Sequence, residues 1–181
     1  MFKHLEKISC ERAILLIAFK GWSDAAEAAT SATDTIISHY QAHKFASFEE
    51  EEFFAFARER PNIKNSKDGR IIEWPNNDLF YISDAIEGTP LIILNGTEPH
   101  FKWKTFSNEV INLCQSMNVQ SVVTLGALLD SIPHTRGVKT QITGQHEFMP
   151  DVFTQNKIDK SRYEGPTGIT SVIIEDFKKI G

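Results

Sequence analysis

The chain has 181 residues, with 41% hydrophobic and 24% charged residues and a formal net charge of −5. This length suits a single domain over residues 1–181, which buries about 70% of its unfolded surface without a disulfide or metal staple. The acidic balance argues against a nucleic-acid-binding protein, because binding phosphate requires a concentrated basic face. We therefore expect an ordinary globular protein that does not bind nucleic acid.

The N-terminal segment, the apolar runs and the cysteines indicate the compartment. The first eleven residues are too charged for a signal peptide. The apolar run Ala13–Phe19 is far shorter than the roughly 20 residues needed to cross a bilayer. Cys10 and Cys114 form no C-x-x-C pair, so reduced thiols are the simpler interpretation. We predict a cytoplasmic protein with no membrane partner.

Three apolar runs predict buried strands: Ala13–Phe19, Pro90–Leu94 and Ser121–Leu125. They lack the alternation expected of a strand that is wetted on one face. Such runs are typical of central strands in a mostly parallel sheet covered on both faces. Further strands are expected at Arg70–Trp74 and Leu79–Ile82, and the polar segment Asn62–Gly69 is expected to be a loop.

Helical patterns follow the first two strands. Ala25–Tyr40 begins after a capping residue, Asp24 or Ser23, and its spacing predicts an inward face of Ala28, Ala32, Ile36 and Tyr40. A helix over Thr105–Met117 should turn Phe106, Val110, Leu113 and Met117 inward. Shorter helices are expected at Glu49–Glu59 and Thr170–Ile180. Strand, loop and helix in this rhythm predict an α/β fold.

The candidate site lies in the loops that leave the three predicted central strands, because ligands and partners meet parallel sheets at the carboxyl ends of their strands. The first loop contributes Gly21, Trp22, Ser23 and Asp24; the second contributes Gly96, Glu98 and Trp103; the third contributes Asp130, His134 and Arg136. A tight turn with a helix cap explains every member of the first loop except Trp22. In the third loop, Arg136 could hold an anion or a partner's carboxylate by a two-pronged hydrogen bond.

Several motifs of catalytic or cofactor-binding proteins are absent from the sequence. It contains no G-x-G-x-x-G, no phosphate-binding G-x-x-x-x-G-K-[ST], no H-E-x-x-H and no G-x-S-x-G. We accordingly expect no cofactor and no metal. A triad of Ser23, His134 and Asp130 can be assembled on paper, but nothing in the sequence fixes its geometry, and the serine already has a capping role.

Six blocks, taken in order, resemble the proteasome assembly chaperone family, in the branch related to its second chaperone that is widespread in bacteria. They are Gly21-Trp-Ser-Asp-Ala25, Phe48 to Pro61 with its Arg-Glu-Arg-Pro ending, Glu73-Trp-Pro75, Gly96-Thr-Glu-Pro99 with Trp103, Leu125-Gly-Ala-Leu128 with Pro133-His-Thr-Arg136, and Tyr163-Glu-Gly-Pro-Thr-Gly168. Each block alone is weak, but six in the family's order are improbable by coincidence.

The resemblance implies a three-layer α/β/α sandwich akin to purine nucleoside phosphorylases. It also implies a protein that binds partners rather than an enzyme, since the eukaryotic members guide proteasome assembly. The family pattern continues beyond the Gly165–Gly168 block, so we expect the C-terminal part to be missing.

These observations lead us to expect a non-catalytic, assembly-chaperone-like protein that binds a protein partner or associates with itself as a homo-oligomer. Trp22, Trp103 and Arg136 are the expected contact residues, because tryptophan and arginine dominate interface energetics. The alternative is a small-molecule enzyme or sensor for a nucleoside or phosphorylated ligand, in which His134 would act as acid or base and Arg136 as an anion clamp.

Overall fold

A computed structural model describes residues 1–10, 12–67, 69–143, 159–160 and 163–180. The chain divides into two compact units, Met1–Leu128 with Thr167–Gly181, and Leu129–Pro166. The first unit contains the main sheet and its helices, and the second contains two short strands. No helix in the described part of the chain combines the length and the apolar character needed to cross a membrane.

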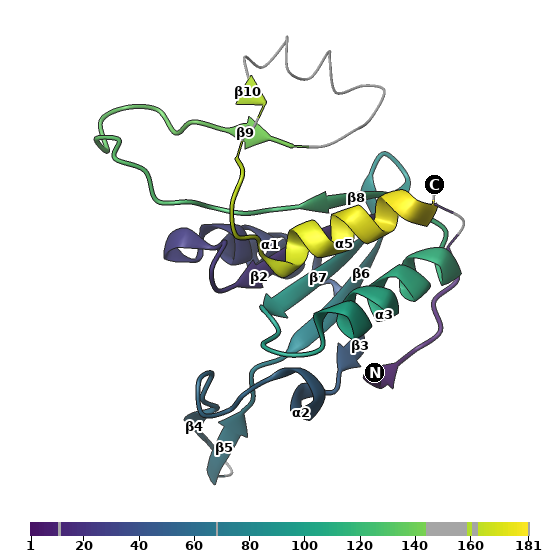
Figure 1. The fold of residues 1–181 in the computed structure, drawn as a ribbon. Helices are drawn as coiled ribbons and strands as arrows, with labels where there is room; N and C mark the ends of the chain where they lie inside the picture. Colours follow the sequence, from purple (N-terminus) through teal and green to yellow (C-terminus); the bar gives the residue numbers. More distant parts are fainter. Residues whose placement is uncertain (11, 68, 144–158, 161–162, 181) are drawn as a thin grey trace. The chain divides into compact units, whose positions relative to one another are not determined.

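A six-stranded sheet forms the centre of the first unit (Figure 1). Its strands, in spatial order, are β1 (Phe2–Leu5), β3 (His43–Phe48), β6 (Asn77–Ile86), β7 (Thr89–Thr97), β2 (Ala13–Lys20) and β8 (Val119–Thr124). β2 runs parallel to both β7 and β8, whereas the other neighbouring pairs are antiparallel. The three predicted apolar strands are thus confirmed, parallel to one another and adjacent.

One of these three strands is not central. β8 ends the sheet, and the side chain of Val123 is 45% exposed. The prediction of a strand covered on both faces was therefore wrong for Ser121–Leu125. β2, by contrast, has a partner on each side, and Leu15 and Ile17 are fully buried. An apolar run of five residues does not reveal how many neighbours a strand has.

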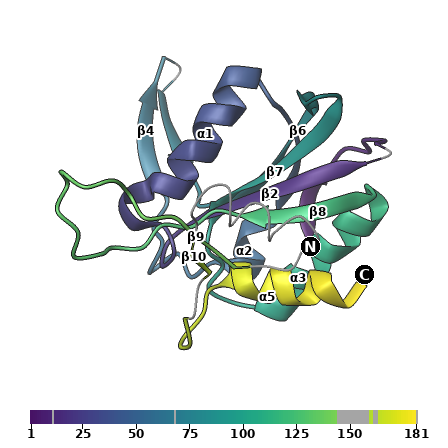
Figure 2. The same ribbon diagram turned by 90° about the horizontal axis from the view of Figure 1, so that it is seen from above.

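Helices cover both faces of the sheet (Figures 1 and 2). α1 (Ala28–Tyr40) packs on one face, where a smaller apolar cluster includes Ile82, Leu91 and Ile93. α3 (Trp103–Ser116) and α5 (Ile169–Phe177) lie on the other face, over the larger core. The predicted three-layer α/β sandwich is confirmed. The predicted C-terminal helix is observed as α5 followed by a short 3-10 turn, Lys178–Ile180.

α3 has the predicted inward face. Phe106, Val110, Leu113 and Met117 are all buried. The ring of Phe106 stacks on Phe48 with centroids 4.3 Å apart. Large apolar residues at helical spacing specify a buried face unambiguously, and here they do so.

The inward face of α1 differs from the prediction. Ala28, Ala32 and Tyr40 are exposed, whereas Ala29, Thr30 and Thr33 are buried. A 3-10 turn (Ala25–Glu27) precedes the helix, with left-handed backbone at Ala26 and Glu27 that rotates the entry of the chain. The buried residues are small, and two of them are threonines whose hydroxyls are hydrogen-bonded, so apolar spacing did not identify this face.

The predicted helix over Glu49–Glu59 is observed only as the short α2 (Glu50–Phe53). Beyond it, the backbone is bound by residues distant in sequence. The carbonyl oxygen of Phe53 accepts hydrogen bonds from the amides of His100 (2.8 Å) and Phe101 (3.2 Å). The Ala55 amide donates to Nδ1 of His100 at 3.0 Å. These tertiary hydrogen bonds replace the helical ones that the sequence pattern favoured.

A β-hairpin lies where a loop was expected. β4 (Asn62–Ser66) pairs in antiparallel register with β5 (Gly69–Glu73), which confirms the strand predicted at Arg70–Trp74 and corrects the loop predicted at Asn62–Gly69. All ten strand residues are exposed. Polar strand residues that face water on both sides carry none of the alternation by which strands are recognised.

The second unit, Leu129–Pro166, contains β9 (Gln141–Ile142) and β10 (Asp159–Lys160) among its described residues. The two strands pair in parallel, with Asp159 opposite Gln141.

Candidate functional site

The ends of β2, β7 and β8 meet at one edge of the sheet, as the sequence predicted. The Glu98 amide donates to the carbonyl oxygen of Lys20 at 2.9 Å, which joins the first and second loops. The Ala127 amide donates to the carbonyl oxygen of Ser23 at 2.8 Å, and the Ala25 amide donates to that of Ala127 at 3.0 Å. Backbone hydrogen bonds therefore join the start of the third loop to the first loop.

The first loop combines a structural carboxylate with an exposed aromatic ring. Asp24 is buried, and its Oδ1 accepts the amide of Ala29 at 2.7 Å, while its Oδ2 accepts Oγ1–H of Thr30 at 2.5 Å. The predicted capping role of Asp24 is confirmed, although the cap reaches across the 3-10 turn. Gly21 has φ +137°, a conformation that favours glycine. Trp22 is 56% exposed, so neither turn nor core explains it.

The second loop holds α5 in place. Oε1 of Glu98 accepts the Ile169 amide at 2.9 Å, where a carboxylate suits the positive end of the helix. The approach is close, because a Cβ on Gly168 would lie 2.9 Å from that oxygen and 3.1 Å from Oγ of Ser23. Gly96 is also required, since a Cβ there would meet Oδ1 of Asn77 at 2.2 Å. Gly96 and Glu98 thus have structural roles at this edge of the sheet: Gly96 allows the close approach of Asn77, and Glu98 holds the start of α5.

Trp103 and His100 are both anchored by hydrogen bonds. The Trp103 indole N–H donates to the carbonyl oxygen of Pro99 at 2.5 Å, and the half-buried ring packs against the larger core. Because Nδ1 of His100 accepts the Ala55 amide, the proton of the neutral ring resides on Nε2. Both rings are held in fixed orientations.

A cavity of about 340 Å³ opens between these loops. Its walls are Lys20, Gly21, Trp22, Arg58, Glu59, Thr97, Glu98, Pro99, His100 and Trp103. We call Trp22, Arg58, His100 and Trp103, which bring the aromatic rings and the guanidinium to its walls, the strand-end patch. Arg58 is exposed and forms no ion pair with the described residues, whereas Lys20 pairs with Glu27 at 3.0 Å. The hydrogen bond between the Lys20 amine and the Glu27 carboxylate raises the pKa of the amine.

Sequence reasoning assigned Trp22, Gly21, Glu98 and Trp103 to this edge but missed Arg58. The segment Arg58-Glu59-Arg60-Pro61 stood among the family-like blocks, but the expected helix concealed that it turns toward the strand ends. The turn is visible in the hydrogen bond from the Arg58 amide to the carbonyl oxygen of Ala55 at 2.8 Å.

The other candidates, Asp130, His134 and Arg136, belong to the second unit. All three are exposed. Oδ1 of Asp130 accepts the amide of Ser131 at 2.7 Å, and the amide of Arg136 donates to the carbonyl oxygen of Pro133 at 2.9 Å. These are local turns. A triad of Ser23, His134 and Asp130 would join residues of two units, and the structure provides no geometry for it.

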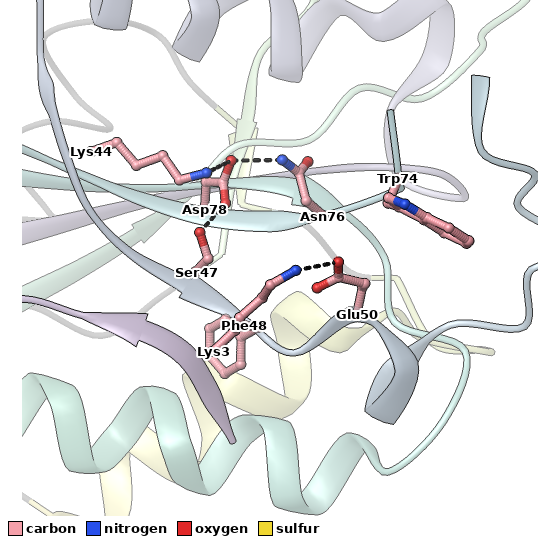
Figure 3. Close-up of a pocket in the computed structure, with 8 residues that line it drawn as sticks. All are labelled: Lys3, Lys44, Ser47, Phe48, Glu50, Trp74, Asn76 and Asp78. Atoms are coloured by element: carbon pink, nitrogen blue, oxygen red, sulfur yellow. Dashed lines mark hydrogen bonds and ion pairs between the residues drawn. The ribbon is translucent and has the colours of Figure 1, made fainter. Parts of the chain in front are cut away.

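A second cavity, of about 330 Å³, lies over β3 and β6 (Figure 3). Here the charges neutralise one another. Lys44 Nζ lies 2.8 Å from Oδ2 of Asp78, which also accepts the amide group of Asn76, and Lys3 Nζ lies 2.6 Å from Oε1 of Glu50. The hydrogen bond from Lys3 and its positive charge lower the pKa of Glu50 against the opposing effect of burial. With its ionic groups already paired, this cavity is less suited to a charged ligand than the strand-end patch.

No cluster of three or more His, Cys, Asp or Glu side chains that could hold a metal ion occurs among the described residues. The strand-end patch instead combines the exposed indole of Trp22 with the exposed guanidinium of Arg58, and tryptophan and arginine are enriched at the centres of protein interfaces.

Solved structures resemble this chain along most of its length. A PAC2 family protein from Streptomyces avermitilis is 31% identical, with a TM-score of 0.80, and the match covers 93% of this chain and 71% of that one. A proteasome-assembly chaperone homologue from Mycobacterium tuberculosis is 29% identical, with a TM-score of 0.73, and the match covers 90% and 68% of the two chains.

A more distant likeness concerns the fold alone. PbaA of Pyrococcus furiosus, an archaeal homolog of proteasome-assembly chaperone, is 10% identical, with a TM-score of 0.66, over 97% of this chain and 69% of that one. Curated proteins gave no match.

The model of the PAC2 family matches residues 18–181, from the end of β2 through α5. This range contains both loops of the strand-end patch and all six blocks in which the sequence resembled assembly chaperones. The chain belongs to the PAC2 family.

Proposed function

We propose that this chain is a non-catalytic, assembly-chaperone-like protein that binds a protein partner through the strand-end patch. The observation that carries the proposal is that the exposed indole of Trp22 and the exposed guanidinium of Arg58, which forms no ion pair with the described residues, line the same cavity. Tryptophan and arginine contribute most often to interface hot spots. A homologue with 29% identity is described as a proteasome-assembly chaperone homologue, which supports the same class of function.

The fixed walls of the patch support binding without large rearrangement. Trp103, His100 and Glu98 are each held by a hydrogen bond to backbone, so little conformational freedom is lost when a partner docks. Asp130, His134 and Arg136 remain proposed contact residues of the second unit.

The test is affinity capture from cytosol with the wild-type chain and a Trp22→Ala/Arg58→Ala variant. Both side chains are exposed, so the variant should fold normally. A stoichiometric partner should be captured by the wild type and lost from the variant. Tyr40→Ala is the matched control, because Tyr40 is an exposed aromatic residue at the end of α1. A partner retained by the double variant would contradict the assignment of the patch.

A further inference from the structure

The β4–β5 hairpin lacks the packing that usually stabilises a sheet. It forms a separate two-stranded sheet, and all of its strand residues are exposed. In Figure 1 it projects beyond the end of the main sheet, on the same side as α2. A two-stranded ribbon alone in water is marginally stable at best, and independent stability needs a third strand or a packed face. Another surface that covers one face of the hairpin would therefore stabilise it.

One face of the hairpin has the composition of an interface. Ile63 lies directly opposite Ile72, and Asn65 lies opposite Arg70, so these four side chains share one face. Ile63 is 65% exposed and Ile72 is 56% exposed. Arg70 forms no ion pair with the described residues. We call Ile63, Asn65, Arg70 and Ile72 the isoleucine face.

The opposite face differs in charge. Lys64 and Ile71 lie opposite each other there, and Lys64 Nζ lies 2.7 Å from Oε2 of Glu73. Glu73 thus neutralises Lys64 within the hairpin, whereas Arg70 has no such ion pair with the described residues. Among the described residues, the isoleucine face thus presents two aliphatic side chains and the positive charge of Arg70.

The charge of the rest of the chain complements this face. Residues 62–73, from the start of β4 to the end of β5, contain three of the 19 lysine and arginine residues and two of the 24 acidic residues, a net charge of +1. The remaining 16 basic and 22 acidic residues give the rest of the chain a net charge of −6. A hairpin of opposite charge to the body that carries it is attracted to the acidic body of another molecule of the same kind.

We propose that the hairpin is an assembly arm, whose isoleucine face docks on the acidic body of a second copy of this chain. Most soluble oligomers are built from identical subunits, and a contact between unlike surfaces of two copies generates rings when the rotation closes. β4 and β5 form a two-stranded sheet, so each has an edge that no third strand of the described residues covers. This inference does not depend on the proposed function, because the isoleucine face and the strand-end patch share no residue.

The experiment compares three forms of the full chain by sedimentation over a wide concentration range. The wild type should associate as concentration rises, and Ile63→Thr/Ile72→Thr should raise the dissociation constant at least about tenfold. Threonine preserves strand propensity, so the hairpin itself is retained. Ile71→Thr is the matched control, since Ile71 is 47% exposed on the opposite face. It should associate as the wild type does.

Two further measurements sharpen the result. Added salt should weaken the association, because complementary charges are screened. Hydrogen exchange of the β4 and β5 amides should slow as concentration rises, and it should not slow in the double variant. Unchanged circular dichroism and thermal midpoint in each variant exclude unfolding.

A wild type that stays monomeric at every concentration would overturn the proposal, as would assembly that survives the double substitution. A hairpin protected only when anionic vesicles or nucleic acid are added would overturn it as well. The two tests are separable. The hairpin variant should lose self-assembly and still capture a partner, whereas the strand-end variant should lose partner capture and still assemble.

Discussion

Asp24 is a buried carboxylate at the start of α1, and it decides how the chain enters the helix. It accepts the Ala29 amide and the Thr30 hydroxyl across a turn in which two residues have left-handed backbone. The sequence offered Asp24 or Ser23 as the capping residue, because Asp followed by Glu three residues later is a recurrent helix start. Asp24 is the one whose carboxylate accepts an α1 amide, although α1 itself begins only at Ala28. The sequence did not reveal the left-handed turn, since neither Ala26 nor Glu27 is a residue that favours positive φ.

We predict that Asp24→Ala lowers the free energy of unfolding by about 1–2 kcal/mol, because the substitution leaves the buried Ala29 amide and the Thr30 hydroxyl without their acceptor. Urea unfolding measures the loss. Glu27→Ala is the control: Glu27 also precedes α1, but its ion pair with Lys20 is exposed and should contribute little. Equal losses for the two variants would contradict the capping role.

The two tryptophans of the strand-end patch differ in how their rings are held. Sequence analysis treated Trp22 and Trp103 alike, as aromatic residues in strand-end loops. The structure shows that Trp103 begins α3, donates its indole N–H to Pro99 and packs on the core. Trp22 does not pack in this way. Only tertiary contacts, which a local pattern does not contain, distinguish the aromatic residue that stabilises the loop from the one that is free to bind.

α5 depends on a residue far away in sequence. The carboxylate of Glu98, in the loop after β7, accepts the first amide of that helix. We predict that Glu98→Ala destabilises the protein by about 0.5–2 kcal/mol, as loss of a helix cap does. Glu98→Gln should cost less, because the amide oxygen still accepts while the charge at the helix dipole is lost.

Hydrogen exchange of the α5 amides locates this effect. Relative to the wild type, Glu98→Ala should accelerate exchange of the α5 amides more than exchange of the α3 amides. Glu175→Ala provides the control, because Glu175 lies on α5 itself with an exposed ion pair to Lys178. Unchanged exchange in α5 after loss of the Glu98 carboxylate would refute the capping role.

Some elements could be predicted from the sequence and others could not. Ala13–Phe19 and the helix containing Phe106 and Val110 carry large apolar residues in an unmistakable pattern, and both predictions were confirmed. β4 consists of Asn62-Ile-Lys-Asn-Ser66, which faces water on both sides, so no periodicity marks it. α2 ends at Phe53, whose carbonyl oxygen accepts the amides of His100 and Phe101, a contact that links residues far apart in sequence.

At the scale of the whole molecule, folding buries the Cys114 thiol. Burial raises the pKa of Cys114 to about 12 from an ordinary value of 9.0. In the unfolded chain the thiol loses its proton near pH 9, whereas in the folded chain it keeps its proton until about pH 12. The contribution of this thiol to stability is therefore complete below pH 9 and is lost as pH rises through this window.

We predict that the free energy of unfolding falls less steeply above pH 9 in Cys114→Ala than in the wild type. The measurement is urea unfolding at a series of alkaline pH values. Cys114→Ala also lowers the free energy of unfolding by removing a buried side chain, but this loss is the same at every pH. The titration of lysine and tyrosine residues affects both proteins equally, so it cancels when one curve is subtracted from the other. Cys10→Ala should change the slope less, since the pKa of its half-buried thiol is raised by less complete burial. Parallel curves for Cys114→Ala and the wild type would contradict the prediction.

The position of β2 between β7 and β8 has a consequence for biosynthesis. β2 leaves the ribosome before β7 and β8, yet Ile14 pairs with Leu91 on one side and with Ser121 on the other. The apolar run Ala13–Phe19 therefore remains without its neighbouring strands until β7 and β8 have been made. Pairing between residues so distant in sequence is slow, and an unpaired apolar strand is prone to aggregate meanwhile. Nascent chains that end before β8 should need protection by cellular chaperones.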